Sequence, residues 1–372
     1  MTRRDVTQPD DRGDRGDRGS GDDRLGAQVT ESFTRIARAS RTAAPTRPGV
    51  PAVQPPAAAS GSTTTGPRPA AGADFTVTLP TTASPSGRVV RPYVVDGTYH
   101  GASGSVRLAA TEGLAGVLNL DGAKVLQLRP GSGEPKVVVQ TSDGSTGLTL
   151  RGVDGRAVAD ATGQRWVLLD PRTGTVTVRD PRGAVLDSTT SAPLAGQARI
   201  RSVVGFSGGR VVLTTAAGTS AWDLGSGQVD EVSGDTALDA SDTAARAVYE
   251  TAGVAGSSCW QVRSTTDQAP VAAPTCGAAG IVSLSADGRY VVVRQTLGDT
   301  VLVYRATGGR PVLQVSVPAG VTVDDTSLRI GLDELVLATS DRTGHRLVGC
   351  TTRGMCEVLT ATSHTPYLLV RD

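Results

Sequence analysis

The stretch IVSLSADGRYVVVRQTLGDTVLVYRATGGRPVLQVSV, residues 281–317, decides the fold because it holds four β-rich runs in 37 residues. The first two runs flank Asp287-Gly288, a dipeptide that favours tight hairpin turns because glycine adopts positive φ without steric cost. The third run, VLVYR, ends shortly before Gly308-Gly309, and PVLQVSV follows it. Apolar, β-branched runs bounded by turn residues predict strands. The stretch therefore predicts one four-stranded antiparallel unit.

The third run of this unit, an apolar strand leading into a turn, has five counterparts elsewhere in the chain. They are KVLQLRPGSG from Lys124, WVLLDPRTG from Trp166, SAWDLGSG from Ser220, CWQVRSTTD from Cys259 and LVGCTTRG from Leu347. The aligned positions are Arg129, Asp170, Asp223, Arg263, Arg305 and Cys350, at intervals of 41, 53, 40, 42 and 45 residues. A strand-built repeat with a period in the forties is typical of a β-propeller.

Strand-like runs also lie at both ends of the six repeats. They are FTVTLP at 75–80, RPYVVDGTYH at 91–100 and PYLLVRD at 366–372. Combined, they would form a seventh blade that pairs N-terminal strands with a C-terminal one and removes two exposed sheet edges. We therefore expect an all-β propeller of four-stranded blades over residues 74–372, with seven blades. A six-bladed ring with the extra strands packed outside is the alternative.

Residues 1–73 lack strand periodicity and predict a disordered tail. A charged repeat, DRGDRGDRG at 11–19, is followed by a segment rich in Pro, Ala, Thr and Ser. Such segments cannot bury enough apolar surface to offset their ordering entropy. Residues 25–41 place Leu25, Val29 and Phe33 on one helical face. This run is either a docking or membrane-surface helix or a transient helix within the tail.

Composition narrows the function classes. The formal net charge is +1 with acids and bases interleaved, which argues against nucleic-acid binding. Aromatic residues make up only 3%, which argues against a large aromatic-lined ligand site. The sequence contains no 18-residue apolar run and no apolar core of a signal peptide in its first 80 residues. We therefore expect no transmembrane segment in this sequence.

Two short motifs resemble the bacterial WD-repeat-like and quinoprotein-like propeller superfamily. Trp222-Asp223 is similar to the Trp-Asp dipeptide that closes the third strand of a blade, and LSADGRYVVV at 284–293 resembles a turn common in bacterial propellers. The resemblance implies a rigid scaffold with variable loops. Only Lys124 and Lys136 of the 37 basic residues are lysine, and 46 residues are Gly, a bias typical of GC-rich, for instance actinobacterial, genomes.

The four cysteines fall into two pairs that flank equivalent turns, Cys259 with Cys276 and Cys350 with Cys356. Opposed residues of a hairpin approach disulfide reach, so we expect two disulfides. A zinc site that includes His345 and reduced cysteines are the alternatives. Disulfides would place the domain outside the reducing cytosol, in the cell envelope or beyond. Since no export signal is visible, either a targeting or anchoring segment lies outside this sequence, or export follows another route, or the protein is cytoplasmic.

No catalytic, metal or cofactor site is expected. Catalytic triads need a base, and only His100, His345 and His364 are available. Adjacent strand residues point to opposite faces, so Asp324-Asp325 and Asp333-Glu334 do not predict two-carboxylate sites outside an irregular loop. Positions facing the central channel are expected to be mainly Val, Leu, Ala and Ser. A quinone cofactor would need a tryptophan to stack on. The three tryptophans are expected in the packing between blades instead; they are Trp166, Trp222 and Trp260.

The function expected from these features is a non-enzymatic, extracytoplasmic binding platform for an unknown protein or envelope ligand. The rim candidates are residues 193–209 and 253–276, and the protein is expected to be monomeric. One alternative is an enzyme that uses the central channel, such as a lyase, a lactonase or a glycan hydrolase. A second is a sensor or accessory domain of a membrane-associated signalling system.

Overall fold

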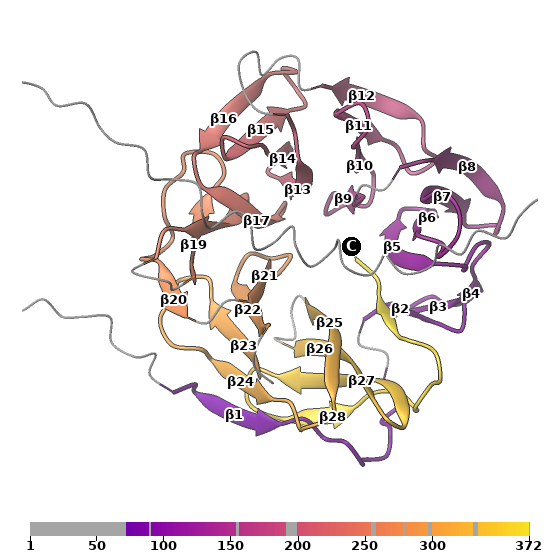
Figure 1. The fold of residues 1–372 in the computed structure, drawn as a ribbon, viewed down its shortest axis with the longest axis vertical. Helices are drawn as coiled ribbons and strands as arrows, with labels where there is room; N and C mark the ends of the chain where they lie inside the picture. The colour runs from indigo at the N-terminus through magenta and orange to yellow at the C-terminus, as the bar shows by residue number, and fades with distance from the viewer. Residues whose placement is uncertain are drawn as a thin grey trace, which may run out of the picture. The chain divides into compact units, whose positions relative to one another are not determined.

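A computed structural model describes residues 72–88, 91–153, 156–190, 199–253, 258–277, 280–296, 300–329 and 334–371. These residues form 29 β-strands and no helix. The strands make seven sheets, and each sheet contacts the next through its innermost strands until the ring closes (Figure 1). The described part of the chain is therefore a seven-bladed β-propeller, and it contains no helix that could span a membrane.

The blades are numbered here in chain order, and each is given from its innermost to its outermost strand. Blade 1 contains β29 (Leu368–Leu369), β2 (Tyr93–Val95), β3 (Thr98–Gly101) and β4 (Gly104–Arg107). Blade 2 contains β5 (Leu114–Leu120), β6 (Ala123–Leu128), β7 (Lys136–Thr141) and β8 (Thr146–Arg151). Blade 3 contains β9 (Val158–Ala159), β10 (Trp166–Asp170), β11 (Thr175–Arg179) and β12 (Val185–Thr189).

The remaining four blades follow the same plan. Blade 4 contains β13 (Ser202–Ser207), β14 (Arg210–Thr214), β15 (Thr219–Asp223) and β16 (Val229–Ser233). Blade 5 contains β17 (Thr236–Ser241), β18 (Arg246–Thr251), β19 (Ser258–Ser264) and β20 (Thr275–Gly277). Blade 6 contains β21 (Gly280–Leu284), β22 (Tyr290–Gln295), β23 (Thr300–Arg305), β24 (Leu313–Ser316) and, outside it, β1 (Phe75–Thr78). Blade 7 contains β25 (Thr322–Arg329), β26 (Glu334–Asp341), β27 (Gly344–Thr351) and β28 (Cys356–Val358).

The ring is closed by strands from both ends of the described chain. β29 pairs antiparallel with β2, so blade 1 combines a C-terminal strand with three N-terminal ones, as the sequence predicts. The expectation for residues 75–80 was wrong, because β1 joins blade 6 as a fifth strand parallel to β24. The edge of blade 6 offered unpaired backbone groups, and β1 satisfies them. The tail predicted for residues 1–73, with its helix at 25–41, lies almost wholly outside the described residues.

The repeat spacing is more even than the sequence alignment implies. The last residues of the third strands lie 38 to 46 residues apart; they are Gly101, Thr141, Arg179, Asp223, Ser264, Arg305 and Thr351. The repeats at Lys124 and Trp166 are second strands, β6 and β10, whereas the other four are third strands. The 53-residue interval therefore reflects a shift of one strand in the alignment. The described end of the first rim candidate, residues 193–209, lies inside the ring, since residues 202–207 form the innermost strand of blade 4.

Aspartates mainly shape the turns, as expected. Asp96-Gly97 has φ of 50° and 68° between β2 and β3, and Gly122 has φ of 70° between β5 and β6. Asp223, in the Trp-Asp dipeptide at the end of β15, accepts hydrogen bonds from the backbone N–H groups of Gly225 and Ser226, both at 3.0 Å. This carboxylate therefore caps a turn.

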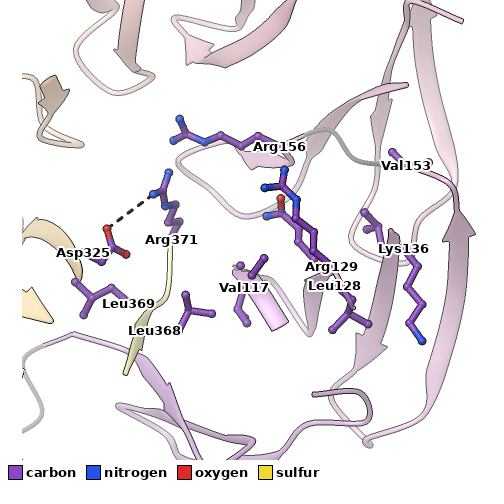
Figure 2. Close-up of a pocket in the computed structure, with 14 residues that line it drawn as sticks. Val117, Leu128, Arg129, Lys136, Val153, Arg156, Asp325, Leu368, Leu369 and Arg371 are labelled. Atoms are coloured by element: carbon purple, nitrogen blue, oxygen red, sulfur yellow. Dashed lines mark ion pairs between the residues drawn. The ribbon is translucent and has the colours of Figure 1, made fainter. Parts of the chain in front are cut away.

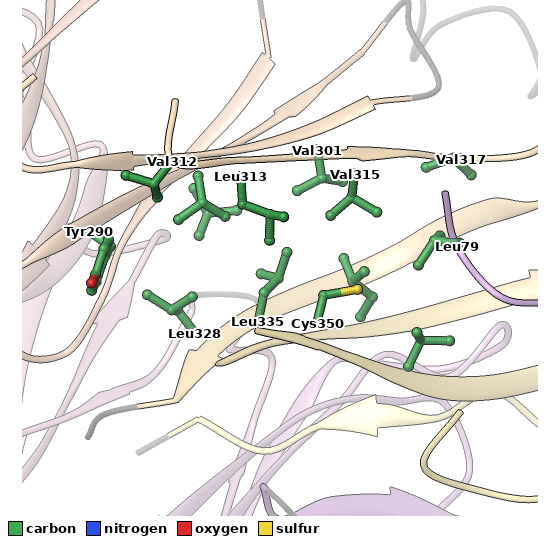
Figure 3. Packing of buried hydrophobic residues seen from close by; sticks show 14 residues of the cluster. Leu79, Tyr290, Val301, Val312, Leu313, Val315, Val317, Leu328, Leu335 and Cys350 are labelled. Carbon is green, nitrogen blue, oxygen red and sulfur yellow. The ribbon is translucent and has the colours of Figure 1, made fainter. Parts of the chain in front are cut away.

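Apolar side chains from facing sheets fill the space between blades. In the cluster between blades 6 and 7, Leu313 and Val315 of β24 meet Leu335 and Cys350, and all four are fully buried (Figure 3). Branched aliphatic side chains interlock well between pleated surfaces. The tryptophans lie in this packing rather than on a cofactor platform. Trp166 and Trp222 are at most 1% exposed, and Trp260 meets Tyr304 edge to face with ring centroids 5.3 Å apart.

Candidate functional site

The centre of the ring contains a cavity of about 620 Å³. Its lining comes from the innermost strands of blades 2 to 7 and from the closing segment after β29. A second, smaller cavity of about 210 Å³ lies between blade 2 and this closing segment, and shares lining residues with the first (Figure 2). Central channels of this kind are concave, pre-formed sites at which a ligand can contact several blades.

β-Bulges in four innermost strands determine which side chains enter the channel. The strand register shifts at Ala115, Val204, Leu238 and Asp324, in β5, β13, β17 and β25. All four residues line one or both cavities. A bulge inserts one unpaired residue and re-aims its neighbours. The same local irregularity therefore directs side chains inward in four different blades.

The bulge in β25 brings both Asp324 and Asp325 into the lining of the channel. Their carboxylates meet different partners, since Asp324 accepts a hydrogen bond from Ser340 at 3.0 Å and Asp325 faces Arg371, so they do not form a two-carboxylate site. Arg294 of β22 holds the bulge, donating hydrogen bonds to the carbonyl oxygens of Val323 and Asp324, both at 2.8 Å. Asp325 is thereby free to meet Arg371 from the closing segment, with Nη2 and Oδ1 3.9 Å apart.

The channel is charged, which corrects the expected lining of Val, Leu, Ala and Ser. Those small residues are present, but Arg156, Arg371, Asp239 and Asp325 project among them from blades 3, 1, 5 and 7. Arg371 reaches the channel because the chain after β29 runs beside β5. Its N–H donates to the carbonyl of Val117, and its carbonyl accepts from the N–H of Asn119, both at 3.1 Å.

Asp239 is a half-buried carboxylate of this group. Burial among the blades raises its pKa above the ordinary value of an aspartate. The positive charge of Arg156 and a hydrogen bond from the backbone N–H of Leu284, 2.9 Å from Oδ2, act in the opposite direction and stabilise the ionised form. Desolvation is the larger effect, so Asp239 holds its proton more tightly than an exposed aspartate.

Arg156 faces the same space from the segment that precedes β9. Burial among the blades lowers its pKa, and the positive charge of Arg371 lowers it further, while Asp239 and Asp325 partly compensate. No hydrogen bond or ion pair within 4.0 Å joins its guanidinium to another described residue. Water in the channel still reaches the side chain. Its backbone is fixed by the next residue, since the N–H of Ala157 donates to Oε1 of Gln127 at 3.0 Å.

The three histidines do not join this cluster, and none lines either cavity. His100 stacks on Tyr93 with ring centroids 4.9 Å apart and shares a hydrogen bond with Ser105. His345 lies 3.5 Å from Asp324, between Nδ1 and Oδ2, and His364 is exposed. Within the described ranges no group of three or more His, Cys, Asp or Glu side chains is placed to hold a metal ion. Of the Asp333-Glu334 pair, Glu334 is buried and accepts a hydrogen bond from the guanidinium of Arg88 at 2.6 Å. Asp333 lies outside the described residues.

The structure brings both cysteine pairs together across outer hairpins. Cys259 opposes Cys276 between β19 and β20, and Cys350 opposes Cys356 between β27 and β28. The Cα atoms are 4.1 Å apart in each pair, and the sulfur atoms lie at disulfide distance. Because the pairs lie in separate blades, the four sulfurs do not converge on a single zinc site.

The second rim candidate, residues 253–276, is largely this outer hairpin. Residues 258–264 form β19 and residues 275–277 form β20, with residues 254–257 outside the described part of the chain. The channel residues, by contrast, were missed by the sequence reasoning. In the sequence, Asp239 and Asp325 look like solvent-facing polar residues of ordinary strands. A bulge that turns such a residue toward the channel cannot be recognised from the alternation of polar and apolar residues.

No protein-family model matches the sequence, and no curated protein does. Among solved structures, the chain is similar to the β-propeller domain of Cps50 (Swd1) from Myceliophteria thermophila. That similarity has a TM-score of 0.50 and 9% identity, over 74% of this chain and 90% of that domain. A prolyl endopeptidase also matches at a TM-score of 0.50 and 14% identity, over 70% of this chain and 45% of the enzyme. At these identities the likeness establishes the fold alone, a β-propeller.

Proposed function

We propose that this protein is a non-enzymatic propeller that binds a protein or envelope ligand at its central channel, outside the reducing cytosol. One observation carries the binding role: charged side chains from four blades converge on a pre-formed cavity of about 620 Å³. No nucleophile with an adjacent base accompanies them among the cavity-lining residues, since no histidine lies there. Fold alone does not choose between binding and catalysis, so the argument rests on this site.

The compartment is argued from the cysteines. Two pairs at disulfide distance, one in blade 5 and one in blade 7, are what a domain in an oxidising compartment would carry. In this proposal the protein acts as a monomer. It has no role in nucleic-acid binding, because the channel carries carboxylates as well as guanidiniums.

Site-specific photo-crosslinking in cells tests the proposal. A photoreactive amino acid at Ile281, which lines the channel and is 52% exposed, should form an adduct with the ligand or partner. Val185 is the matched control, because it has the same exposed fraction but lies on β12 at the outer edge of blade 3. Adducts from Ile281 and none from Val185 are expected. Adducts from Val185 alone would move the binding surface to the outer edge and refute the channel.

One observation supports the alternative that the protein is an enzyme: the pKa of Asp239 is raised, in a channel that also contains Arg156. A carboxyl group whose pKa is raised holds its proton to higher pH and can act as a general acid. If the protein is a lyase, a lactonase or a glycan hydrolase, purified protein should turn over lactones or acidic glycans, and Asp239→Asn should abolish turnover. Turnover that persists in Asp239→Asn would exclude this residue as the acid.

A further inference from the structure

The smaller cavity carries more positive than negative charge. It is lined by Arg129, Lys136, Arg156 and Arg371, and Asp325 is its one carboxylate among the described residues. In the view of Figure 2 the side chains of Arg156 and Arg371 extend to the same side of the cavity, with Lys136 turned away, and the charge of Arg371 acts on Arg156. Arg371 is 50% exposed, so water screens part of the repulsion between these like charges, and an anion between them would relieve the rest.

Asp239 and Asp325 partly compensate the charge of this pair, but neither forms a close ion pair with it among the described residues. Arg371 has only a long contact of 3.9 Å with Asp325, and Arg156 has no ion pair with any residue that the structure describes. Elsewhere on the same domain, paired arginines show much closer geometry. Arg263 meets Asp235 at 2.6 Å and Arg346 meets Asp341 at 2.8 Å. The channel arginines are therefore held near one another without the carboxylate partners that satisfy arginines elsewhere.

The backbone beside each of the two arginines is fixed by hydrogen bonds. Ala157, next to Arg156, is fixed by Gln127 of β6, and Arg371 is fixed by backbone hydrogen bonds to β5. Gly116 lies against Gln127, and a Cβ at this position would come within 2.9 Å of Nε2. Glycine here lets the Gln127 side chain reach across to blade 3. A site whose donors are already positioned loses less entropy on binding a ligand.

We infer that the Arg156–Arg371 pair is a binding site for the carboxylate of a small aliphatic acid, either free or at the end of a larger ligand. A planar carboxylate matches the fork of a guanidinium. The rest of the cavity wall is aliphatic, from Val117, Leu128, Val137, Val153, Leu368 and Leu369, and would contact a short hydrocarbon chain. The inference rests on the proposed function only in placing the ligand in the same channel.

Carboxylate fits this cavity better than phosphate. A phosphate dianion would be repelled more strongly by Asp325, and it would leave the aliphatic wall without an apolar partner. The volume of about 210 Å³ is below the roughly 300–1,000 Å³ of sites for drug-sized ligands, which suits a short chain.

Isothermal titration of the purified full chain with sodium butyrate, at constant ionic strength, tests the assignment. Saturable binding is expected, and Arg156→Gln or Arg371→Gln should weaken it at least tenfold, as loss of a charge-assisted bidentate contact predicts. Arg310→Gln is the control, because Arg310 pairs with Asp74 away from both cavities. It should leave the affinity unchanged.

A variant with the opposite expected effect distinguishes a change in binding from a folding defect. Asp325→Asn removes the carboxylate that competes for Arg371, so it should tighten butyrate binding by about three- to tenfold. A folding defect cannot produce tighter binding. Equal heats for all variants would overturn the inference, and so would phosphate binding as tightly as butyrate. The titration uses purified protein without any partner, so its result is independent of the crosslinking experiment at Ile281. Failure of the carboxylate site and failure of the proposed function can therefore be told apart.

Discussion

At the scale of single residues, aspartates in this protein have two roles that their local sequence barely distinguishes. Asp143 is exposed and accepts hydrogen bonds from the backbone N–H and the side chain of Ser145, at 2.9 and 2.8 Å, and from Thr141, which together lower its pKa to about 2. Asp239 is enclosed by blades, and its pKa is raised. The turn role follows from Asp-Gly spacing. The channel role depends on neighbours from other blades.

The Asp239→Asn variant should separate desolvation from hydrogen bonding. Asparagine keeps an acceptor for the N–H of Leu284 but carries no charge. Because the folded pKa of Asp239 is raised, its contribution to stability is complete below about pH 4, the ordinary pKa of an unfolded aspartate, and is lost as pH rises through the folded pKa. The free energy of unfolding of wild type relative to the variant should therefore fall with rising pH, by at most about 1.4 kcal/mol per unit.

Urea unfolding at a series of pH values measures this difference. NMR titration of the carboxyl carbons provides an internal comparison, with a pKa of about 2 for Asp143 and a pKa above the ordinary range for Asp239. Parallel stability curves for wild type and Asp239→Asn would mean that burial does not perturb this carboxyl group.

At the scale of strands and hairpins, the sequence predicted most of the elements. The four runs of residues 281–317 are β21 to β24 in the expected order. The alignment took second strands for third strands in blades 2 and 3, because an apolar second strand there also leads into a turn; in blade 2, β6 and β7 are similarly apolar. The bulges at Leu238 and Asp324 were not predictable, since one inserted residue changes the face of the residues around it without changing composition.

The two outer hairpins should differ in how much their cysteine pairs stabilise the fold. Loop-closure entropy predicts a loss of about 3 kcal/mol for Cys259→Ser with Cys276→Ser, which span 17 residues. The same arithmetic predicts about 2 kcal/mol for Cys350→Ser with Cys356→Ser, which span 6 residues. Urea unfolding of both double variants, with and without reductant, measures the difference. Reductant should destabilise wild type and leave a variant that lacks both pairs unchanged.

The state of these cysteines in native cells tests the proposed compartment. Alkylation before lysis, followed by peptide mapping and cell fractionation, should find Cys259, Cys276, Cys350 and Cys356 protected in an envelope or secreted fraction. Four alkylated thiols in a cytosolic fraction would contradict the extracytoplasmic part of the proposal. The binding role of the channel would be untouched by that result.

At the scale of the whole molecule, closure of the ring links stability to the site. The segment that closes blade 1 through β29 also carries Arg371 into the channel. The sequence predicted the closing blade from strand runs at its two ends. It could not predict the channel lining, because that depends on residues from blades far apart in sequence, such as Arg156 and Asp325, meeting at the centre.

Leu369→Ala should therefore weaken the whole ring. Leu369 is 2% exposed and packs with Val336 and Leu347 of blade 7, so its truncation should cost about 2–5 kcal/mol. Val185→Ala, at an exposed position on an outermost strand, should change stability by less than about 0.5 kcal/mol. Thermal unfolding measures both. A loss confined to blade 1, detected by hydrogen exchange, would show that the ring does not unfold cooperatively.

The central claim is that the channel, and not an outer edge, is where this protein meets its ligand. The most direct measurement is the yield of in-cell crosslinks from Ile281 compared with Met355, which is 65% exposed beside the outer hairpin of blade 7. The channel model predicts adducts from Ile281 that decrease in Arg156→Gln, and none from Met355. Adducts from Met355 with none from Ile281 would contradict it.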